Sequence, residues 1–229
     1  QVGDQLDRGD DEREILDLFE DLRLNAESAG GAFYPLLGNH EIMNVELDFR
    51  YVTDGGYADF SDVSYNPADN LILSYPEEER GRAAAFRPGG MYASILSEHK
   101  VILELEGTLF VHGGILPAHV DYGIAEINTE TSKWMRGEGS ESLPMASSDS
   151  PVWSRHYSDE TGADDCALLD EVLTQSGAQR MVVAHTVQER INSACNDQVW
   201  RVDVGLAAYY GGTPEVLEIL GDDVIVLEE

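Results

Sequence analysis

The chain has 229 residues, of which 42% are hydrophobic, enough to bury the core of one domain. Its 44 acidic residues outnumber the 14 basic ones, and the formal net charge of −30 argues against nucleic acid and anionic membranes as partners. Only two of the basic residues are Lys, a composition compatible with high salt and equally with a biased genome. No stretch approaches the roughly 20 apolar residues that cross a bilayer. We therefore expect a single domain over residues 1–229 without a membrane partner.

Two cysteines, Cys166 and Cys195, bear on the compartment. They form no CxxC pair, which argues against a cysteine metal site and leaves free thiols or one disulfide. A disulfide between the helix predicted around residue 166 and the loop around residue 195 would indicate an oxidising compartment. Cytoplasmic, periplasmic and secreted locations all stay open at this point, as does the oligomeric state.

The first predicted element is a helix over residues 11–28, where apolar residues recur at helical spacing until Gly30-Gly31. The apolar stripe of this helix, residues 15–24, is expected to belong to the core. An apolar run over 32–37 predicts a buried strand that ends at Gly38-Asn39-His40-Glu41. Such units imply a parallel sheet with helices on its faces.

From about residue 46 to 76 the periodicity is lost, and turn signals predict a long surface segment. Beyond it we expect helices over 77–86, 90–98, 118–135 and 165–175, and a polar loop over 137–150. Strands are expected at 101–105, 108–111, 179–184, 197–203, 214–220 and 223–228. No internal repeat or linker between domains is evident.

Four polar residues follow predicted strand ends, where open α/β folds build their sites: Asp4, Asn39, His112 and His185. A carboxylate, an amide oxygen and two imidazoles suit Mn²⁺, Fe or Zn²⁺ better than Ca²⁺. Two such metals about 3.5–4 Å apart would clamp a phosphoryl group for in-line attack. The pattern therefore predicts hydrolysis of a phosphate ester.

Other polar and aromatic residues are weaker candidates. His99, His119 and His156 fit no motif and are expected to be surface or hydrogen-bonded residues. Three residues are secondary candidates for shaping a pocket: Asn44, Arg50 and Tyr51. Either Tyr209 or Tyr210 could cover the site, with packing as an equal alternative.

Four sequence blocks resemble, in order, the signature blocks of the phosphoprotein phosphatases, which are calcineurin-like metallophosphoesterases. The blocks are Gly3–Gly9 (GDQLDRG), Gly38–Glu41 (GNHE), His112–Gly114 (HGG) and Ala184–Thr186 (AHT). The resemblance runs over nearly the whole chain. Within the family, three segments resemble the bacterial-type Shewanella-like phosphatases: Asp7–Asp11, Asn39–Asn44 and Trp153–Arg155.

The resemblance implies an α/β fold, a four-layer α/β/β/α sandwich that here lacks its first strand, and two divalent metal ions, Mn²⁺ or alternatively Fe or Zn²⁺. It makes Asp4 the carboxylate that bridges both metals. The remaining ligands of the second metal would be Asn39, His112 and His185.

The resemblance also assigns phosphate-binding and catalytic residues. Arg8 and Arg155 would bind phosphate oxygens, because a guanidinium presents a planar fork of donors. His40 would contact the phosphate and protonate the leaving oxygen, and Asp7 would hold its ring. The implied activity is a metal-dependent phosphomonoester hydrolase with a hydroxide between the metals as nucleophile. Its substrates would be phosphorylated Ser/Thr or Tyr side chains of proteins, or small phosphomonoesters.

The sequence departs from the family pattern in two places. The opening GDxHG block, which supplies an Asp and a His to the first metal, is absent, so we expect an N-terminally truncated domain that binds the second metal better than the first. Ala184 stands where the family usually has Gly. Two other functions stay open: a dinucleoside polyphosphate hydrolase, and a non-catalytic phosphate-binding remnant with an incomplete first metal site.

Overall fold

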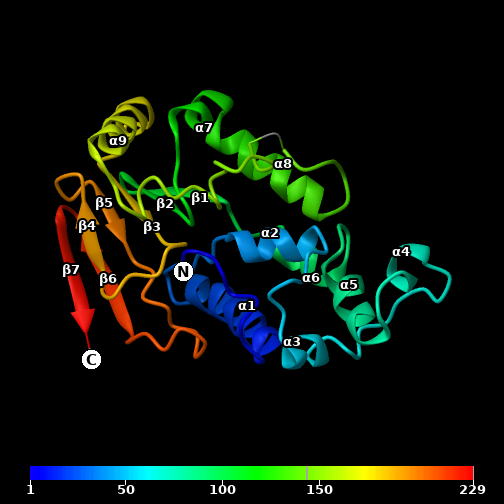
Figure 1. Cartoon of the computed structure of the whole chain (residues 1–229). Helices are drawn as coiled ribbons and strands as arrows, with labels where there is room; N and C mark the ends of the chain where they lie inside the picture. Colours follow the sequence, from blue (N-terminus) through cyan, green and yellow to red (C-terminus); the bar gives the residue numbers. More distant parts are fainter. Residues whose placement is uncertain (143, 229) are drawn as a thin grey trace. The chain divides into compact units, whose positions relative to one another are not determined.

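The computed structural model describes residues 1–142 and 144–228, so Leu143 of the predicted 137–150 loop lies outside the described residues, as does Glu229. The chain folds into two compact units. The first contains Gln1, Gly3–Lys100 and Glu130–Ser140, and the second contains Val2, Val101–Thr129 and Glu141–Glu229. The fold is mixed α/β, as predicted (Figure 1).

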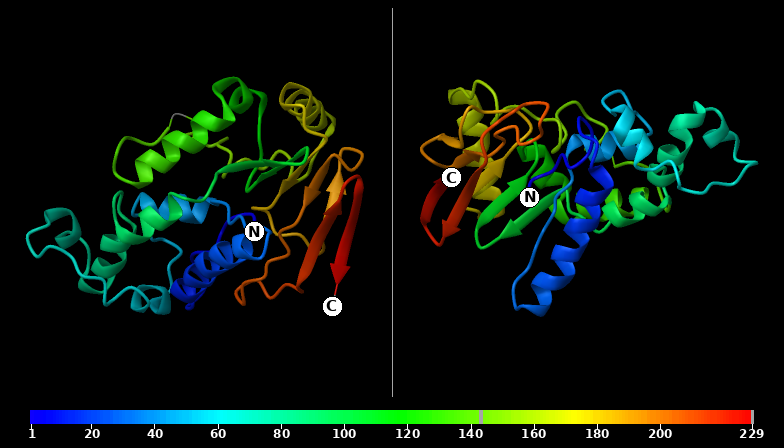
Figure 2. Two further views of the ribbon diagram at one scale, coloured as in Figure 1. Left: turned by 180° about the vertical axis from the view of Figure 1, so that it is seen from behind. Right: turned by 90° about the horizontal axis from the view of Figure 1, so that it is seen from below.

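The longest helix of the first unit is α1 (Glu12–Ser28), close to the predicted range. Leu16 is buried in the core, and Phe19 packs on Phe33 with ring centroids 5.2 Å apart, so the chain runs back along the helix after its end (Figure 2). Four large apolar side chains of α1 are exposed: Ile15, Leu18, Leu22 and Leu24. The prediction that the whole 15–24 stripe belongs to the core is therefore wrong, because helical spacing identifies an apolar face but not what covers it.

Residues 32–37 do not form the predicted strand. The described chain there makes one isolated parallel bridge, between Leu36 and Lys100, and Leu37 N donates to Lys100 O at 2.9 Å. Pro35 lies in the middle of the run and has no N–H to donate to a ladder. Leu36 N also donates to Gln1 O at 3.1 Å, so isolated backbone hydrogen bonds and burial hold Leu36 and Leu37, and the segment still leads Gly38 to the start of the next helix.

Short helices make up the rest of the first unit. They are α2 (Asn39–Val45), α3 (Asp54–Ala58), α4 (Asn70–Leu73), η1 (Glu77–Glu79), α5 (Arg80–Phe86) and α6 (Met91–Leu96). The segment predicted to be irregular contains α3 and α4, which are capped by the side chains of Thr53 and Asp69. In the core of this unit, the Phe60 ring packs edge to face on Phe86 and on Tyr92, with its centroid 4.9 Å from both.

The helix predicted over 118–135 is two helices, α7 (Pro117–Tyr122) and α8 (Ile124–Met135). Gly123 separates them with a φ of 107°, a conformation that only glycine adopts without strain. Among the described residues, no helix is long and apolar enough to cross a membrane.

The second unit contains the main sheet, in the order β1-β2-β3-β5-β4 (Figure 1). Its strands are β1 (Ile102–Leu105), β2 (Thr108–Val111), β3 (Arg180–Val183), β4 (Asn192–Ala194) and β5 (Val199–Arg201). The three central strands β2, β3 and β5 are parallel, and the edge strands β1 and β4 are antiparallel to their neighbours. Strand β3 is buried along its whole length, as expected for the middle of a parallel sheet. The carboxyl ends of β2 and β3 therefore lie side by side.

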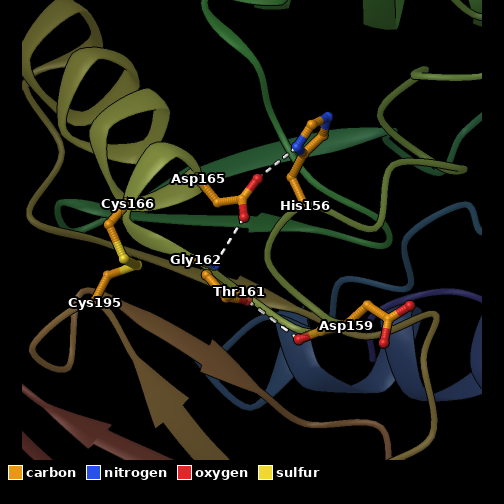
Figure 3. Close-up of a disulfide and its surroundings, with 7 residues drawn as sticks. All are labelled: His156, Asp159, Thr161, Gly162, Asp165, Cys166 and Cys195. Atoms are coloured by element: carbon orange, nitrogen blue, oxygen red, sulfur yellow. Dashed lines mark hydrogen bonds and ion pairs between the residues drawn. A yellow bond between two sulfur atoms is a disulfide. The ribbon is translucent and has the colours of Figure 1, made fainter.

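The last two strands, β6 (Glu215–Leu220) and β7 (Asp223–Glu228), form a separate hairpin, as their predicted ranges suggested. Helix α9 (Ala163–Ser176) leads into β3 and packs against α7. A disulfide joins Cys166 in the first turn of α9 to Cys195 in the turn between β4 and β5 (Figure 3). Of the possibilities that the sequence leaves open for these cysteines, the structure therefore contains the disulfide.

Candidate active site

The loop between the start of the chain and α1 carries Asp4, Asp7 and Arg8 in the first unit. All three residues have left-handed backbones, with φ values of 59°, 69° and 57°. For residues with a side chain, this conformation costs roughly 1–2 kcal/mol each. Strain of this kind persists only where neighbouring contacts fix it, and it gathers at functional sites.

The first part of the loop is fixed by one buried carboxylate, that of Glu41. One of its oxygens accepts hydrogen bonds from the backbone N–H groups of Asp4 (2.9 Å) and Gly38 (2.6 Å). The other accepts from the N–H groups of Gln5 (2.8 Å) and Leu6 (3.1 Å). Glu41 thereby ties the strained loop to the first turn of α2.

The two predicted oxygen ligands of the first unit lie next to each other. His40 N donates to Asp4 Oδ1 at 3.2 Å, and Asn39 is the residue before it. A Cβ on Gly38 would come within 2.2 Å of Asp4 Oδ1, so glycine is needed for this close approach. The Nδ2 of Asn39 faces the sulfur of Met43 at 3.9 Å, so the amide oxygen of Asn39 points away from Met43.

The ring of His40 is held by Asp7. His40 Nδ1 lies 2.6 Å from Asp7 Oδ2, and Asn44 Nδ2 donates to the other oxygen of Asp7 at 3.0 Å. Burial by itself lowers the pKa of His40, but the hydrogen bond with Asp7 and the charges of Asp4, Asp7 and Glu41 outweigh it, so the pKa lies above its usual value. The site thus favours a protonated ring whose Nδ1 side is fixed.

Arg8 lies on the other side of the same ring. Its Nη1 is 2.9 Å from His40 Nε2, and its guanidinium covers the ring of Tyr51 at 4.4 Å. A guanidinium only donates hydrogen bonds, so the contact of Arg8 with Nε2 requires a neutral His40 ring. The neighbouring carboxylates favour the protonated ring instead. His40 Nε2 is therefore the atom that gains or loses a proton. Arg50, in contrast, is exposed and pairs with Asp48 at 2.5 Å.

In the second unit, the adjacent ends of β2 and β3 deliver His112 and His185. His112 Nε2 lies 3.2 Å from His185 Nδ1, and Ala184 N donates to His112 O at 2.8 Å. His185 has a φ of 68°, and Trp153 packs edge to face on its ring. The structure therefore brings the two predicted imidazole ligands together.

The donor atoms fit a divalent cation. His112 Nδ1 lies 2.8 Å from the carbonyl oxygen of Val2, so Nδ1 carries the proton and Nε2 keeps its lone pair. A hydrogen bond at the second ring nitrogen is typical of metal-binding histidines. Two nitrogens that bind one tetrahedral metal at about 2.0–2.1 Å lie about 3.3 Å apart, close to the spacing of the two rings. The first unit offers the Asp4 carboxylate and the Asn39 amide.

Arg155 is anchored beside His185. Its Nη1 donates to Thr186 Oγ1 at 2.7 Å, and Ser158 Oγ lies 2.9 Å from the same hydroxyl. Arg155 is otherwise exposed. Next to it is an open cavity of about 530 Å³. Its lining residues are Ser158, Asp159, Glu160, Thr161, Thr186, Val187, Gln188 and Arg201.

The remaining histidines have structural partners. His156 Nδ1 pairs with Asp165 Oδ1 at 2.7 Å beside the disulfide (Figure 3). His99 and His119 are buried, which lowers the pKa of both. Tyr210 packs on Gly205, whereas Tyr209 is largely exposed.

Sequence reasoning missed the residues that hold the site together. Glu41 lies within a recognised block, yet the block does not reveal that it accepts four backbone hydrogen bonds. Arg82, a fully buried residue of α5, contacts Asp7 and Asn44, and it belongs to no motif. Thr186 lies in the recognised AHT block, which does not reveal that its hydroxyl anchors Arg155.

Comparison with known proteins agrees with this geometry. The family described as calcineurin-like phosphoesterase matches residues 1–189. Shewanella-like protein phosphatase 2 of Arabidopsis thaliana is 39% identical over 256 residues, which cover 97% of this chain and 66% of that protein. Shewanella-like protein phosphatase 1 of Plasmodium berghei (strain Anka) is 24% identical over 219 residues, which cover 91% of this chain and 57% of that protein.

Solved structures extend the comparison to the fold. A cold-active protein tyrosine phosphatase superposes with a TM-score of 0.72 at 24% identity, over 99% of this chain and 62% of that chain. The chain thus spans about two thirds of the length of the Arabidopsis protein and of this solved phosphatase. The family match covers most of the chain, and the order of its sequence blocks agrees. The chain therefore belongs to the calcineurin-like phosphoesterase family, and the resemblance to Shewanella-like protein phosphatases seen in its sequence is confirmed.

Proposed function

We propose that this chain carries out metal-dependent hydrolysis of phosphomonoesters on protein side chains. One observation carries the proposal: Arg8 and Asp4 lie on the Nε2 side of the His40 ring, and Asp7 holds its Nδ1 side. This cluster combines a phosphate-binding cation, a metal-binding carboxylate and a proton donor. If Asn39-His40-Glu41 were only the solvated start of a helix, the structure would not need these contacts.

The proposed metal ligands are Asp4, Asn39, His112 and His185. The covalent chain supports their convergence, because Val2 belongs to the second unit and accepts a hydrogen bond from His112. Consecutive Cα atoms are about 3.8 Å apart, so the Cα of Asp4 lies within about 7.6 Å of that of Val2. The chain connection therefore limits how far Asp4 can lie from Val2, the residue that His112 contacts.

Divalent cations bound by these residues, Mn²⁺ being our first choice, would neutralise phosphate charge and activate water. Arg8 would bind phosphate oxygens through its guanidinium fork, and Arg155 would do so after leaving or sharing Thr186. Contacts from two arginines orient the phosphoryl group for in-line attack.

His40 would protonate the leaving oxygen. Its Nδ1 is committed to Asp7, so Nε2 is the only ring nitrogen that can donate. Asp7 stabilises the imidazolium and keeps the ring in one orientation. The names of the relatives, protein phosphatases and a protein tyrosine phosphatase, support protein side chains as substrates. The proposal covers phosphotyrosine, phosphoserine and phosphothreonine side chains.

The test uses the full-length protein encoded by the gene, loaded with Mn²⁺. Asp4→Ala and His112→Ala should lower bound metal and reduce turnover of p-nitrophenyl phosphate by more than about 100-fold, since even residues behind the ligands contribute 10–100-fold. Arg8→Ala should keep its metal and lose about 10–100-fold in kcat/KM, as expected for charge-assisted hydrogen bonds to phosphate.

Arg50→Ala is the matched control for Arg8→Ala, because it removes an exposed arginine that forms an ion pair with Asp48, two residues away. Its activity should equal that of the wild type. Unchanged metal content in both ligand variants would refute the ligand assignment. Preferential cleavage of a dinucleoside polyphosphate over phosphotyrosine and phosphothreonine peptides would replace the proposed substrate class.

A further inference from the structure

Arg82 is the most deeply buried cation of the first unit. It lies in α5 with no exposed surface, and its guanidinium packs 5.2 Å from the ring centroid of Phe60 and 5.0 Å from that of Phe86. Burial of a charge among aromatic rings is costly unless carboxylates and acceptors compensate it. The partners of Arg82 are therefore informative about its role.

Its guanidinium contacts four groups on four different segments. Nε donates to Asn44 Oδ1 at 2.8 Å, and Nη1 donates to Gly56 O at 2.9 Å. Nη1 also pairs with the Glu12 carboxylate, and Nη2 reaches Asp7 Oδ1 at 3.3 Å. Both carboxylates are buried, so the fork balances two negative charges inside the unit.

These contacts converge on Asp7. Its Oδ1 receives Arg82 and Asn44, and its Oδ2 holds His40. Because Arg82 donates to Asn44 Oδ1, the Asn44 amide must turn its NH₂ group toward Asp7. Glu12 adds a further link, because it accepts the Asp7 N–H at 2.6 Å. Arg82 therefore acts on Asp7 directly, through Asn44 and through Glu12.

The backbone around Arg82 is shaped for this insertion. A Cβ on Gly81 would come within 2.1 Å of Phe60 O, so α5 can approach the neighbouring segment only with glycine there. A Cβ on Gly56 would meet Arg82 Nη1 at 3.3 Å. A cation that served only to fill space would not require two such close approaches.

We propose that Arg82 is a positioning residue that fixes the Asp7 carboxylate and, through it, the His40 ring for proton transfer to the leaving oxygen. This inference rests on the proposed phosphatase function. Arg82 itself touches neither substrate nor metal ligands in this arrangement. Loss of Arg82 leaves Asp7 with fewer anchors and lets the imidazole tilt, and a misplacement on the order of 1 Å costs about 100-fold in rate.

The test variant is Arg82→Met combined with Glu12→Gln, in the full-length Mn²⁺-loaded protein. The double change removes Arg82 together with Glu12, and Asp7 keeps His40 as its remaining charged partner. This is less damaging than leaving both carboxylates without the guanidinium. The Gln oxygen still accepts the Asp7 N–H. The matched control is Arg87→Met with Asp69→Asn, which removes an ion pair of the same unit remote from the His40 cluster.

Two aryl phosphates separate positioning from general damage. Phenolate is a poor leaving group that needs a proton, whereas p-nitrophenolate leaves without one. The Arg82 variant should lose about 100-fold in kcat for phenyl phosphate. It should lose much less for p-nitrophenyl phosphate, with KM and metal content unchanged. Arg82→Lys should recover part of the loss, and the control pair should change neither substrate.

Equal losses on both substrates, or no loss on either, would overturn the positioning role. A second measurement does not need turnover: the proton resonance of the His40 Nδ1–H in its hydrogen bond to Asp7, recorded on the protein loaded with diamagnetic Zn²⁺ because Mn²⁺ would broaden it. It should shift or broaden in the Arg82 variant and stay in place in the control. If the wild type hydrolyses neither substrate, the proposed function fails. An unchanged resonance in the Arg82 variant would overturn the positioning role independently.

Discussion

Glu41 illustrates how one side chain can set the geometry of a whole loop. Its two oxygens accept four backbone N–H groups, two each, and the residue is fully buried. We predict that Glu41→Gln, which has the same shape, destabilises the protein by roughly 3 kcal/mol or more, since bonds to a charged group contribute about 1.5–3 kcal/mol each. The new NH₂ group would face two N–H donors and could bond to neither.

Urea unfolding checks this prediction, with Glu46→Gln as the control. Glu46 is exposed at the end of the same helix, so its substitution should change the unfolding free energy by less than about 0.5 kcal/mol. Metal content should fall in Glu41→Gln alone, because the Asp4 backbone loses its anchor. Equal stability of the two variants would show that Glu41 does not hold the loop.

At the scale of single residues, the sequence predicted the side chains that we assign to metal and phosphate. It predicted less well the buried side chains that hold them in place. Asp4, Asn39 and His40 stand in recognisable blocks, so the family resemblance could assign their roles. Arg82 lies 30 residues before His112, where the nearest block begins, and only the fold brings it to Asp7. Buried supports of this kind depend on tertiary contacts, which leave no local pattern.

Among the elements, the disulfide between Cys166 and Cys195 closes a loop with a sequence separation of 29. A loop of this size restricts the unfolded chain enough to stabilise the fold by about 3–4 kcal/mol. It links the first turn of α9 to the β4–β5 turn, where Cys195 itself has a φ of 51°. We predict that Cys166→Ser with Cys195→Ser lowers the unfolding free energy by about 2–4 kcal/mol.

Calorimetry with and without dithiothreitol provides the measurement. Reductant should lower the melting temperature of the wild type to that of the double variant and should leave the variant unchanged. An oxidised wild type that melts with the variant would mean that the bridge adds no stability. In that case, restriction of the unfolded chain by the disulfide would not explain the stability of the protein.

Elements with long, regular patterns were predicted well, and the exceptions have physical causes. Helix α1 and strands β1, β2, β6 and β7 lie within a residue or so of their predicted ranges. The strand at 32–37 fails because Pro35 removes a donor, and Gly123 divides a helix whose apolar spacing continues across it. Strand β4 has three residues, too few for an alternating pattern to be visible.

The net charge of −30 acts on the molecule as a whole. A large excess of one sign repels itself and destabilises the compact state. Exposed ion pairs such as Arg13–Asp62, at 2.7 Å, oppose this effect, but each contributes only about 0–1 kcal/mol. With 44 acidic residues against 14 basic ones, most carboxylates have no cation available, so the repulsion should dominate.

We therefore predict that the melting temperature rises as NaCl increases from about 0.1 M to about 1 M, over which the Debye length falls from about 10 Å to about 3 Å. Screening depends on ionic strength, so KCl at the same concentration should give the same rise. Sucrose at equal osmolality controls for exclusion of solutes from the surface, which stabilises folded proteins without screening. A melting temperature that falls with salt would mean that ion pairs outweigh repulsion, and the excess negative charge would then be stabilised locally by its few arginines.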